Sequence, residues 1–110
     1  NERWISRAEH HPVVDVLMRT ARAAGFEPEV AFEAHDYQEA QAMVAVGLGV
    51  ALVPSLALTS LRDDVRVVSL QPEAPARTIL VGRLADRRFT PAEAALWELL
   101  ADVGSKFASV

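Results

Sequence analysis

The feature that most constrains the fold of this chain is a continuous apolar run, Val-Ala-Leu-Val at positions 50–53. Gly49 precedes this run and Pro54 ends it. A run of this length suits a strand buried on both faces, and such strands are typical of parallel sheets. Parallel strands need crossover connections, which are usually helices. The run therefore predicts a chain in which strands and helices alternate.

The residues before this run fit that expectation. Pro12 stands where a first helical residue would, apolar residues follow at helical spacing, and Gly25 can end the helix, so residues 12–24 are predicted to be helical. Apolar and polar residues alternate over positions 29–34, which indicates a strand. A short apolar pair, Trp4-Ile5, indicates the end of an earlier strand.

A second helix is predicted between the strand at 29–34 and the apolar run. Asp36 is its expected N-cap, and Glu39 three residues later completes a pattern like a capping box. Gly47 is the expected end of this helix, and Gly49 is expected to permit a close backbone approach into the buried strand.

The second half of the chain is predicted to continue the alternation. A short helix is expected at 55–61 and strands at 65–70 and 78–84, separated by a connector that contains Pro72 and Pro75. Thr90-Pro91-Ala92-Glu93 is a strong helix start, with a capping threonine and a glutamate at the third position. This order implies an α/β fold, with helices layered on a mostly parallel sheet.

Composition excludes several classes of protein. The chain has no cysteine, which excludes a disulfide scaffold, a thiolate zinc site and a cysteine nucleophile. Its net charge of −4 argues against a nucleic-acid-binding surface, and no apolar run approaches the length of a membrane span. The N-terminal residues show no signal-peptide pattern, so we expect a cytoplasmic protein that uses no cofactor.

Patterns that could carry catalysis or metal binding are weak. No serine lies in a Gly-x-Ser-x-Gly elbow, so an enzyme is not expected. His10 and His11, with Glu9 and Asp15, form the one group that resembles a metal site, and a solvated helix start explains it better. Gly47-Leu48-Gly49 closes a helix and enters a strand, which is the reverse of the order in a nucleotide-binding loop.

His35, Asp36 and Tyr37 are the more interesting candidates. They stand at the carboxyl end of one predicted strand and the N-terminus of the next helix, which is where ligands bind in open α/β sheets. The alternative is that Asp36 only caps the helix between two half-exposed neighbours. Both interpretations stay open at this point.

Four short motifs together carry a family resemblance, and the last of them is the most specific: Gly25-Phe26-x-Pro28, Phe32-Glu33, Asp36-Tyr37, and Val-Ala-Val-Gly-Leu-Gly-Val-Ala-Leu-Val-Pro at 44–54. The chain resembles the C-terminal part of the effector-binding domain of LysR-type transcriptional regulators. The order of the remaining predicted elements follows the same family, so the resemblance covers essentially the whole chain.

The resemblance implies a fold and a function. Family members combine an N-terminal helix-turn-helix with a two-lobed domain of the type II periplasmic-binding-protein fold, and a small metabolite, often an organic acid or aromatic compound, binds between the lobes. By that resemblance, residues 1–71 correspond to lobe II. Residues 72–110 correspond to a connector and a return strand and helix of lobe I, so the chain is expected to be a fragment.

The resemblance also implies site residues by their position in the motif. The residues expected to face the cleft follow the first two strands, and they are Ile5, Ser6, Arg7, His35, Asp36 and Tyr37. DNA would be bound only through a helix-turn-helix absent from these residues, so the chain alone is not expected to bind DNA specifically.

Two other classes of protein stay open for this chain. A lobe of a solute-binding protein shares the same fold, and a small α/β enzyme would need a catalytic constellation that the sequence does not show.

Apolar residues of the last strand and helix would lack the partners that the rest of lobe I supplies. We therefore expect self-association through residues 78–107.

Overall fold

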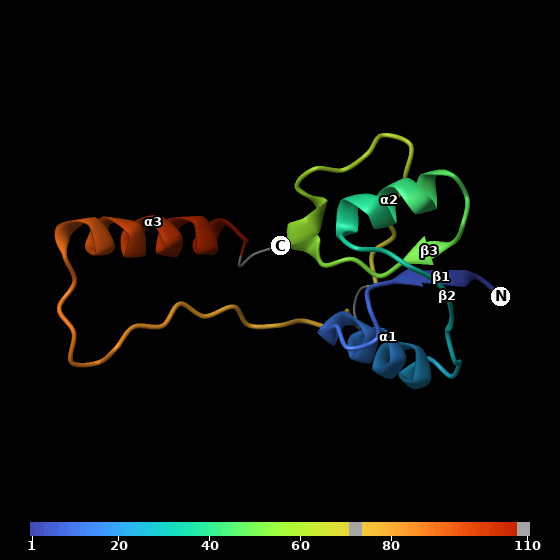
Figure 1. Ribbon diagram of the computed structural model, residues 1–110, viewed down its shortest axis with the longest axis horizontal. Helices are drawn as coiled ribbons and strands as arrows, with labels where there is room; N and C mark the ends of the chain where they lie inside the picture. The colour runs from blue at the N-terminus through green and yellow to red at the C-terminus, as the bar shows by residue number, and fades with distance from the viewer. Residues whose placement is uncertain (71–73, 108–110) are drawn as a thin grey trace. The chain divides into compact units, whose positions relative to one another are not determined.

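A computed structural model describes residues 1–70 and 74–107 of the chain (Figure 1). The chain divides into two compact units, Asn1–Pro75 and Ala76–Val110, here called unit 1 and unit 2. Unit 1 contains the sheet and the candidate site. Unit 2 contains a single long helix.

Unit 1 is built on a three-stranded parallel sheet. Its strands are β1 (Arg3–Ser6), β2 (Glu29–Glu33) and β3 (Val50–Ala51), in the order β2-β1-β3. Both neighbours run parallel to β1, with Trp4 paired to Val30 on one side and to Val50 on the other. The predicted α/β class with a parallel sheet is therefore confirmed.

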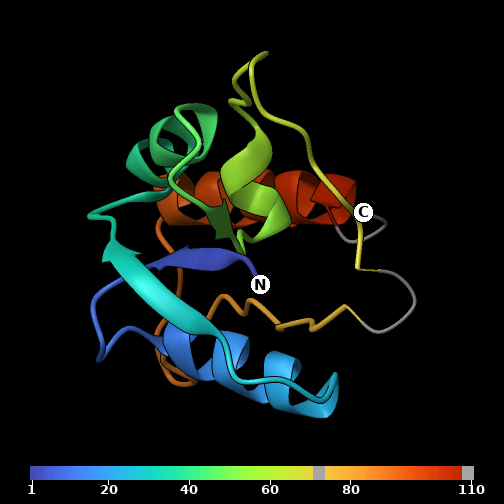
Figure 2. The same ribbon diagram turned by 90° about the vertical axis from the view of Figure 1, so that its right-hand side faces the viewer.

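Two helices cover the sheet. Helix α1 (Pro12–Ala23) and helix α2 (Tyr37–Ala45) lie on opposite faces of it, which gives unit 1 three layers (Figures 1 and 2). Both helices end in the same way, with a glycine at positive φ just past the C-cap. At the end of α2, Gly47 has a φ of +83°, its N–H donates to the Val44 carbonyl, and Leu48 N–H donates to Met43. These paired bonds form a Schellman motif, so the predicted helix end is confirmed.

The core of unit 1 lies between the sheet and α2. Ile5, Ala34 and Ala40 are almost fully buried there, and Ile5 on the central strand is the largest of the fully buried side chains. On α1, Leu17 and Ala21 are buried on the face that the helical spacing predicted. The central strand β1 is thus the element around which unit 1 packs.

Gly49 permits the close approach that the sequence predicted. A Cβ atom on this residue would lie only 3.0 Å from the carbonyl carbon of Arg3 and would collide with its carbonyl oxygen. The chain therefore enters β3 in a position that only glycine can occupy without displacing the backbone of β1.

Several predicted elements of the middle and second half are wrong. The apolar run at 50–53 forms only the two residues of β3, and both are half-buried, because β3 lies at an edge of the sheet. Residues 65–70 and 78–84 form no strand, since no described strand pairs with either segment. The helix expected at 55–61 is a shorter 3-10 turn, η1 (Ser55–Leu58).

The segment after η1 is tied to α2 through a buried polar side chain. The Gln41 side-chain amide donates to the Ser60 carbonyl at 3.2 Å, and Arg62 N–H donates to Gln41 Oε1 at 2.9 Å. Gln41 is 4% exposed, so these bonds satisfy a group that would be costly to bury alone. Arg62 in turn forms a two-pronged ion pair with Asp64, at 2.8 Å and 2.7 Å. Bonding to Arg62 lowers the pKa of the Asp64 carboxyl.

Unit 2 contains helix α3 (Pro91–Phe107), whose start matches the prediction. Glu93 N–H donates to Thr90 Oγ1, and Thr90 N–H donates to the Glu93 carboxylate, which completes a capping box. The Arg83 guanidinium lies over the rings of Phe89 and Trp97, 4.8 Å and 5.8 Å from their centroids.

The apolar residues of α3 remain exposed. None of its described residues is buried, and the exposed fractions of Leu96 and Leu99 are 56% and 62%. Among the described residues, no helix is both long enough and apolar enough to cross a membrane.

Candidate functional site

A small pocket opens in unit 1 where the strands end. It is formed by the last residues of β1, the start of α1, the first turn of α2 and the end of β3. Its lining residues are Ile5, Ser6, Arg7, Val13, Tyr37, Ala40, Ala51 and Leu52. Most of these side chains are apolar.

The topology explains why these residues meet. Strands β1 and β3 are parallel neighbours, so their carboxyl ends, at Ser6 and Ala51, reach the same edge of the sheet. Helix α2 begins at Tyr37, directly after the strand on the other side of β1, and brings its first turn to the same edge. This is the general position of ligand sites in open α/β sheets.

Arg7 carries the charge of the pocket. Its guanidinium lies 5.3 Å from the centroid of the Tyr37 ring, in a cation–π contact. Its Nε atom is buried and finds no hydrogen-bond partner among the described residues. No carboxylate in the described part of the chain lies within ion-pair distance of Arg7. The pocket thus contains a cation that no anion among the described residues neutralises.

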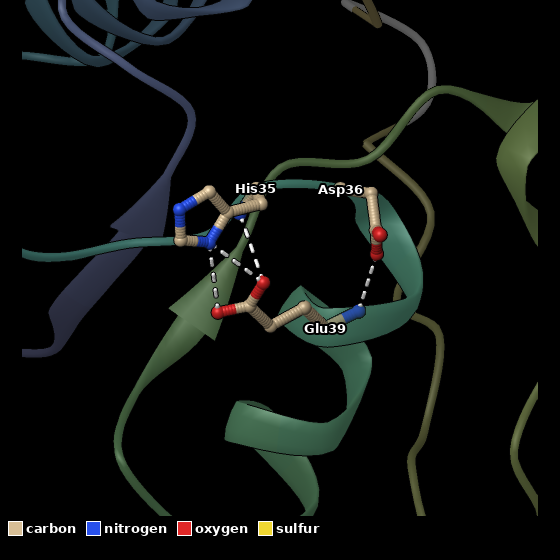
Figure 3. Close-up of polar contacts among 3 residues, drawn as sticks. All are labelled: His35, Asp36 and Glu39. Atoms are coloured by element: carbon tan, nitrogen blue, oxygen red, sulfur yellow. Dashed lines mark hydrogen bonds and ion pairs between the residues drawn. The ribbon is translucent and has the colours of Figure 1, made fainter.

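His35 and Asp36 lie outside this lining and serve the start of α2 (Figure 3). Asp36 Oδ1 accepts from Glu39 N–H at 2.7 Å, which confirms it as the N-cap. The Glu39 carboxylate bonds backward to the His35 N–H at 3.1 Å and to His35 Nδ1 at 3.0 Å. The Asp36 half of the expected capping box therefore forms as predicted. The Glu39 half differs, because its carboxylate accepts from the N–H of His35, the residue before the N-cap, and not from the N–H of Asp36.

The structure brings together four of the six predicted site residues. Ile5, Ser6, Arg7 and Tyr37 line the pocket, whereas the side chain of His35 is 84% exposed and Asp36 is committed to its cap. Sequence reasoning missed Leu52, because the predicted strand at 50–53 includes this residue, whereas β3 ends at Ala51. Val13 gave no strand-end signal, since it lies on a helix.

His11, one of the two histidines before α1, has a structural role. His11 is the N-cap of α1, and its Nδ1 accepts from Val13 N–H at 3.2 Å. Across residues 1–70 and 74–107, no three metal-ligating side chains gather into a group that could hold an ion. His11 therefore positions the start of the helix that supplies Val13 to the pocket.

A second hollow lies in unit 2, beside the start of α3. Gly82, Arg83, Leu84, Arg87, Phe89 and Glu93 line it. Its charged side chains are already engaged, since Arg87 pairs with Glu93 and Arg83 stacks on Phe89. This hollow is therefore a product of the contacts that start α3, and Arg83 is the charged side chain of its lining that has no ion pair among the described residues.

Comparison with known proteins places the chain in a family. The family model described as the LysR substrate binding domain matches residues 1–105. No match was found among curated proteins or among solved structures. The family is regulatory and not enzymatic, and the parallel sheet of unit 1 is consistent with its periplasmic-binding-protein-like fold. The chain therefore belongs to the LysR substrate-binding domain family.

Proposed function

We propose that this chain senses a small-molecule effector on behalf of a LysR-type transcriptional regulator in the cytoplasm. The family match over residues 1–105 is the observation that carries this proposal. The position of the pocket at the carboxyl ends of β1 and β3 supports it, because ligands bind at that edge of open α/β sheets.

The proposed binding site includes all six residues expected from the sequence. Ile5, Ser6, Arg7 and Tyr37 contact the effector directly from the pocket lining. His35 and Asp36 stand beside the pocket at the start of α2 and reach a bound molecule from its rim. Lobe I supplies the opposite wall in this proposal, so that the effector bridges the two lobes.

The response is proposed to reach DNA through a helix-turn-helix outside these 110 residues. An effector that binds better to one arrangement of the lobes shifts the regulator towards that arrangement. Residues 1–71 are proposed as lobe II and residues 72–110 as the return into lobe I.

Self-association is part of the same proposal. The exposed apolar side chains of α3 need cover, and a second copy of the chain provides it. Light scattering behind size exclusion is expected to show a species larger than 12.0 kDa that grows with concentration. A monomer over the whole concentration range, with α3 protected from proteolysis, would contradict this part.

The test of the proposed function uses the full-length regulator and a promoter reporter. A panel of small organic acids and aromatic metabolites is screened for compounds that raise the melting temperature and change transcription. Tyr37→Ala is expected to weaken both responses, and His35→Ala is expected to weaken them less. Glu27→Gln, on the exposed Arg22–Glu27 pair away from the pocket, is the control. If no compound changes transcription, or if Tyr37→Ala leaves the response intact, the proposed function is wrong.

A further inference from the structure

The hollow in unit 2 is large enough to hold a small molecule. Its volume is about 300 Å³, which is the lower end of the range for small-molecule sites. Gly82 and Arg83 precede a turn that the Arg87 N–H closes onto the Leu84 carbonyl, and Phe89 follows that turn. The turn therefore brings the two walls of the hollow together within unit 2.

Arg83 is the charged side chain of this hollow that is held in place without an ion pair. Its guanidinium lies 4.8 Å from the centroid of the Phe89 ring and 5.8 Å from that of the Trp97 ring. The two ring centroids are only 5.4 Å apart, so both rings cover the guanidinium from the same side. No carboxylate among the described residues pairs with Arg83. The rings thus hold the guanidinium while its N–H donors stay available to a ligand.

The segment that forms the hollow is positively charged, although the whole chain has a net charge of −4. Residues 76–90 contain four arginines and one aspartate, which gives this segment a net charge of +3. Arg87 pairs with Glu93, whereas Arg77 and Arg88 are exposed and, like Arg83, have no acidic partner in the described part of the chain. A local cluster of one sign attracts anions whatever the net charge of the chain. The overall negative charge therefore does not exclude a phosphate-binding site here.

We propose that this hollow binds a nucleotide unit, meaning a planar base together with its phosphate. Guanidinium planes and aromatic rings stack on bases, and guanidinium N–H donors pair with phosphate oxygens. Arg83 and Phe89 place both kinds of group in the lining of one hollow. A free nucleotide and a nucleotide within a single strand present this same chemistry. The site lies in unit 2, so it goes beyond effector sensing and does not depend on the pocket of unit 1.

The probes are adenosine 5′-monophosphate (AMP), adenosine, which lacks the phosphate, and ribose 5-phosphate, which lacks the base. The 110-residue chain, labelled with ¹⁵N, is titrated with each compound at constant ionic strength. The Arg83 Nε–H resonance and the backbone amides of Gly82 and Phe89 are followed. AMP is expected to shift these signals and to bind about tenfold or more tightly than either partial compound, because only AMP engages both the flat faces and the charge.

A short single-stranded oligomer of deoxyadenylate distinguishes the two sources of the nucleotide. Binding of the oligomer that is tighter per nucleotide than binding of AMP would assign the site to single strands, since neighbouring phosphates then meet the other arginines of residues 76–90. Equal binding would assign it to free nucleotides. Both results support the proposed chemistry.

Four variants separate charge, stacking and structure. Arg83→Gln is expected to weaken AMP binding about tenfold, whereas Arg83→Lys keeps the contact with phosphate and loses the flat face. Phe89→Leu is expected to lower the affinity for AMP towards that for ribose 5-phosphate, because it removes an aromatic ring and keeps an apolar side chain. Arg66→Gln is the matched control, since it makes the same charge change at an exposed residue of unit 1 that does not line the hollow. Helical circular dichroism of each variant establishes that α3 is intact.

Equal affinities for AMP and ribose 5-phosphate would overturn the contact with the base, and with it the proposed ligand. An AMP affinity that survives Arg83→Gln, or that falls equally in Arg66→Gln, would overturn the role of Arg83. Binding of no probe at Gly82, Arg83 and Phe89 would also overturn the inference. These measurements follow residues of unit 2 and use no promoter, so they are distinct from failure of the effector response.

Discussion

The two units of this chain are stabilised by different kinds of interaction. Unit 1 buries Ile5, Leu17 and Ala34 and pairs β1 with two neighbours. Unit 2 buries no described residue of α3 and relies on contacts close in sequence, namely a capping box, the Arg83 stack and the Asp102–Lys106 ion pair. Tertiary packing therefore supports the first unit, and local chemistry supports the second.

This difference bears on function. A helix of 17 residues is only marginally stable on its own, even with good caps and side-chain pairs. The pocket lies wholly on the unit that has a core, so its residues are positioned by elements that resist local unfolding. Substitutions of matched type in the two units test this contrast directly.

The largest effect is expected for truncation of the central core residue. Ile5→Ala should lower the free energy of unfolding of unit 1 by about 2–5 kcal/mol, because it empties a fully buried site. Leu99→Ala, at a position 62% exposed on α3, should change the stability of the monomeric chain at high dilution by less than about 0.5 kcal/mol, because the cover proposed for α3 comes from a second copy. Urea unfolding of Ile5→Ala is followed by Trp4 fluorescence with Trp97 replaced by Phe, and that of Leu99→Ala by Trp97 fluorescence with Trp4 replaced by Phe, so that each signal reports on the unit that carries the substitution.

Similar losses of unfolding free energy for Ile5→Ala and Leu99→Ala would contradict the conclusion that tertiary packing supports unit 1 and local contacts support unit 2. A large loss for Leu99→Ala would mean that α3 is covered by a partner, which the concentration dependence of unfolding would reveal.

The second largest effect on stability is expected for a substitution at Gly49. Gly49→Val should destabilise unit 1 by about 1–3 kcal/mol, because the new side chain meets the backbone of Arg3. Gly82→Val is the matched control in unit 2, where a Cβ would meet no atom within 4 Å. Melting curves that show equal shifts for the two variants would mean that β1 and β3 do not approach at Gly49.

A smaller effect is expected at the helix caps. Asp36 and Thr90 each accept a hydrogen bond from the N–H three residues later, at 2.7 Å and 3.2 Å. Replacing either by alanine should cost about 1 kcal/mol of helix stability. The consequences should differ: Asp36→Ala lowers the unfolding midpoint of unit 1, whereas Thr90→Ala reduces the helical circular dichroism signal and leaves that midpoint unchanged. A midpoint that moves equally in both variants would show that the units unfold together.

The smallest effect is expected for the ion pair between Arg62 and Asp64, and it is measured as the pKa of the Asp64 carboxyl. Hydrogen bonding from Arg62 lowers the pKa of the Asp64 carboxyl below its ordinary value of 3.8. The pair therefore supports the folded segment above that value, and its contribution is lost as the pH falls through the lowered pKa. NMR titration should show Asp64 ionising below pH 3.8 in the native chain. Arg62→Gln should return it to the ordinary value, and a pKa that does not respond to this change would exclude the pairing.

The sequence was sufficient for those elements whose signals are local. Pro12 and Gly25 bounded α1, Asp36 began α2, and the Thr90–Glu93 pattern began α3, since caps act within one turn. The strands were harder, because a strand exists only where a partner pairs with it. The apolar run at 50–53 predicted a strand buried on both faces, yet β3 is a half-buried edge strand, and the fully buried Ile5 lies on the central strand β1.

Some features of the candidate site could likewise be predicted from the sequence, and others could not. Arg7 was expected from its place in the family motif, and Tyr37 also from its position at a strand end and helix start; both line the pocket. The engagement of His35 with Glu39 could not be predicted, because it depends on which backbone N–H the returning carboxylate reaches. The unpaired Nε of Arg7 has no counterpart in any sequence pattern, since it depends on how neighbouring elements shield that atom.

The order of the strands has a consequence for how the protein is made. The central strand β1 is synthesised before both strands that pair with it, and its second partner arrives only when Val50 pairs with Trp4. On the ribosome, one hydrogen-bonding edge of β1 therefore stays unpaired until β2 is synthesised, and the other until β3 is synthesised. Contacts so distant in sequence slow folding, and unpaired strand edges invite intermolecular pairing. The nascent chain is most exposed to aggregation before β3 emerges, which is the interval in which a chaperone would have the most to protect.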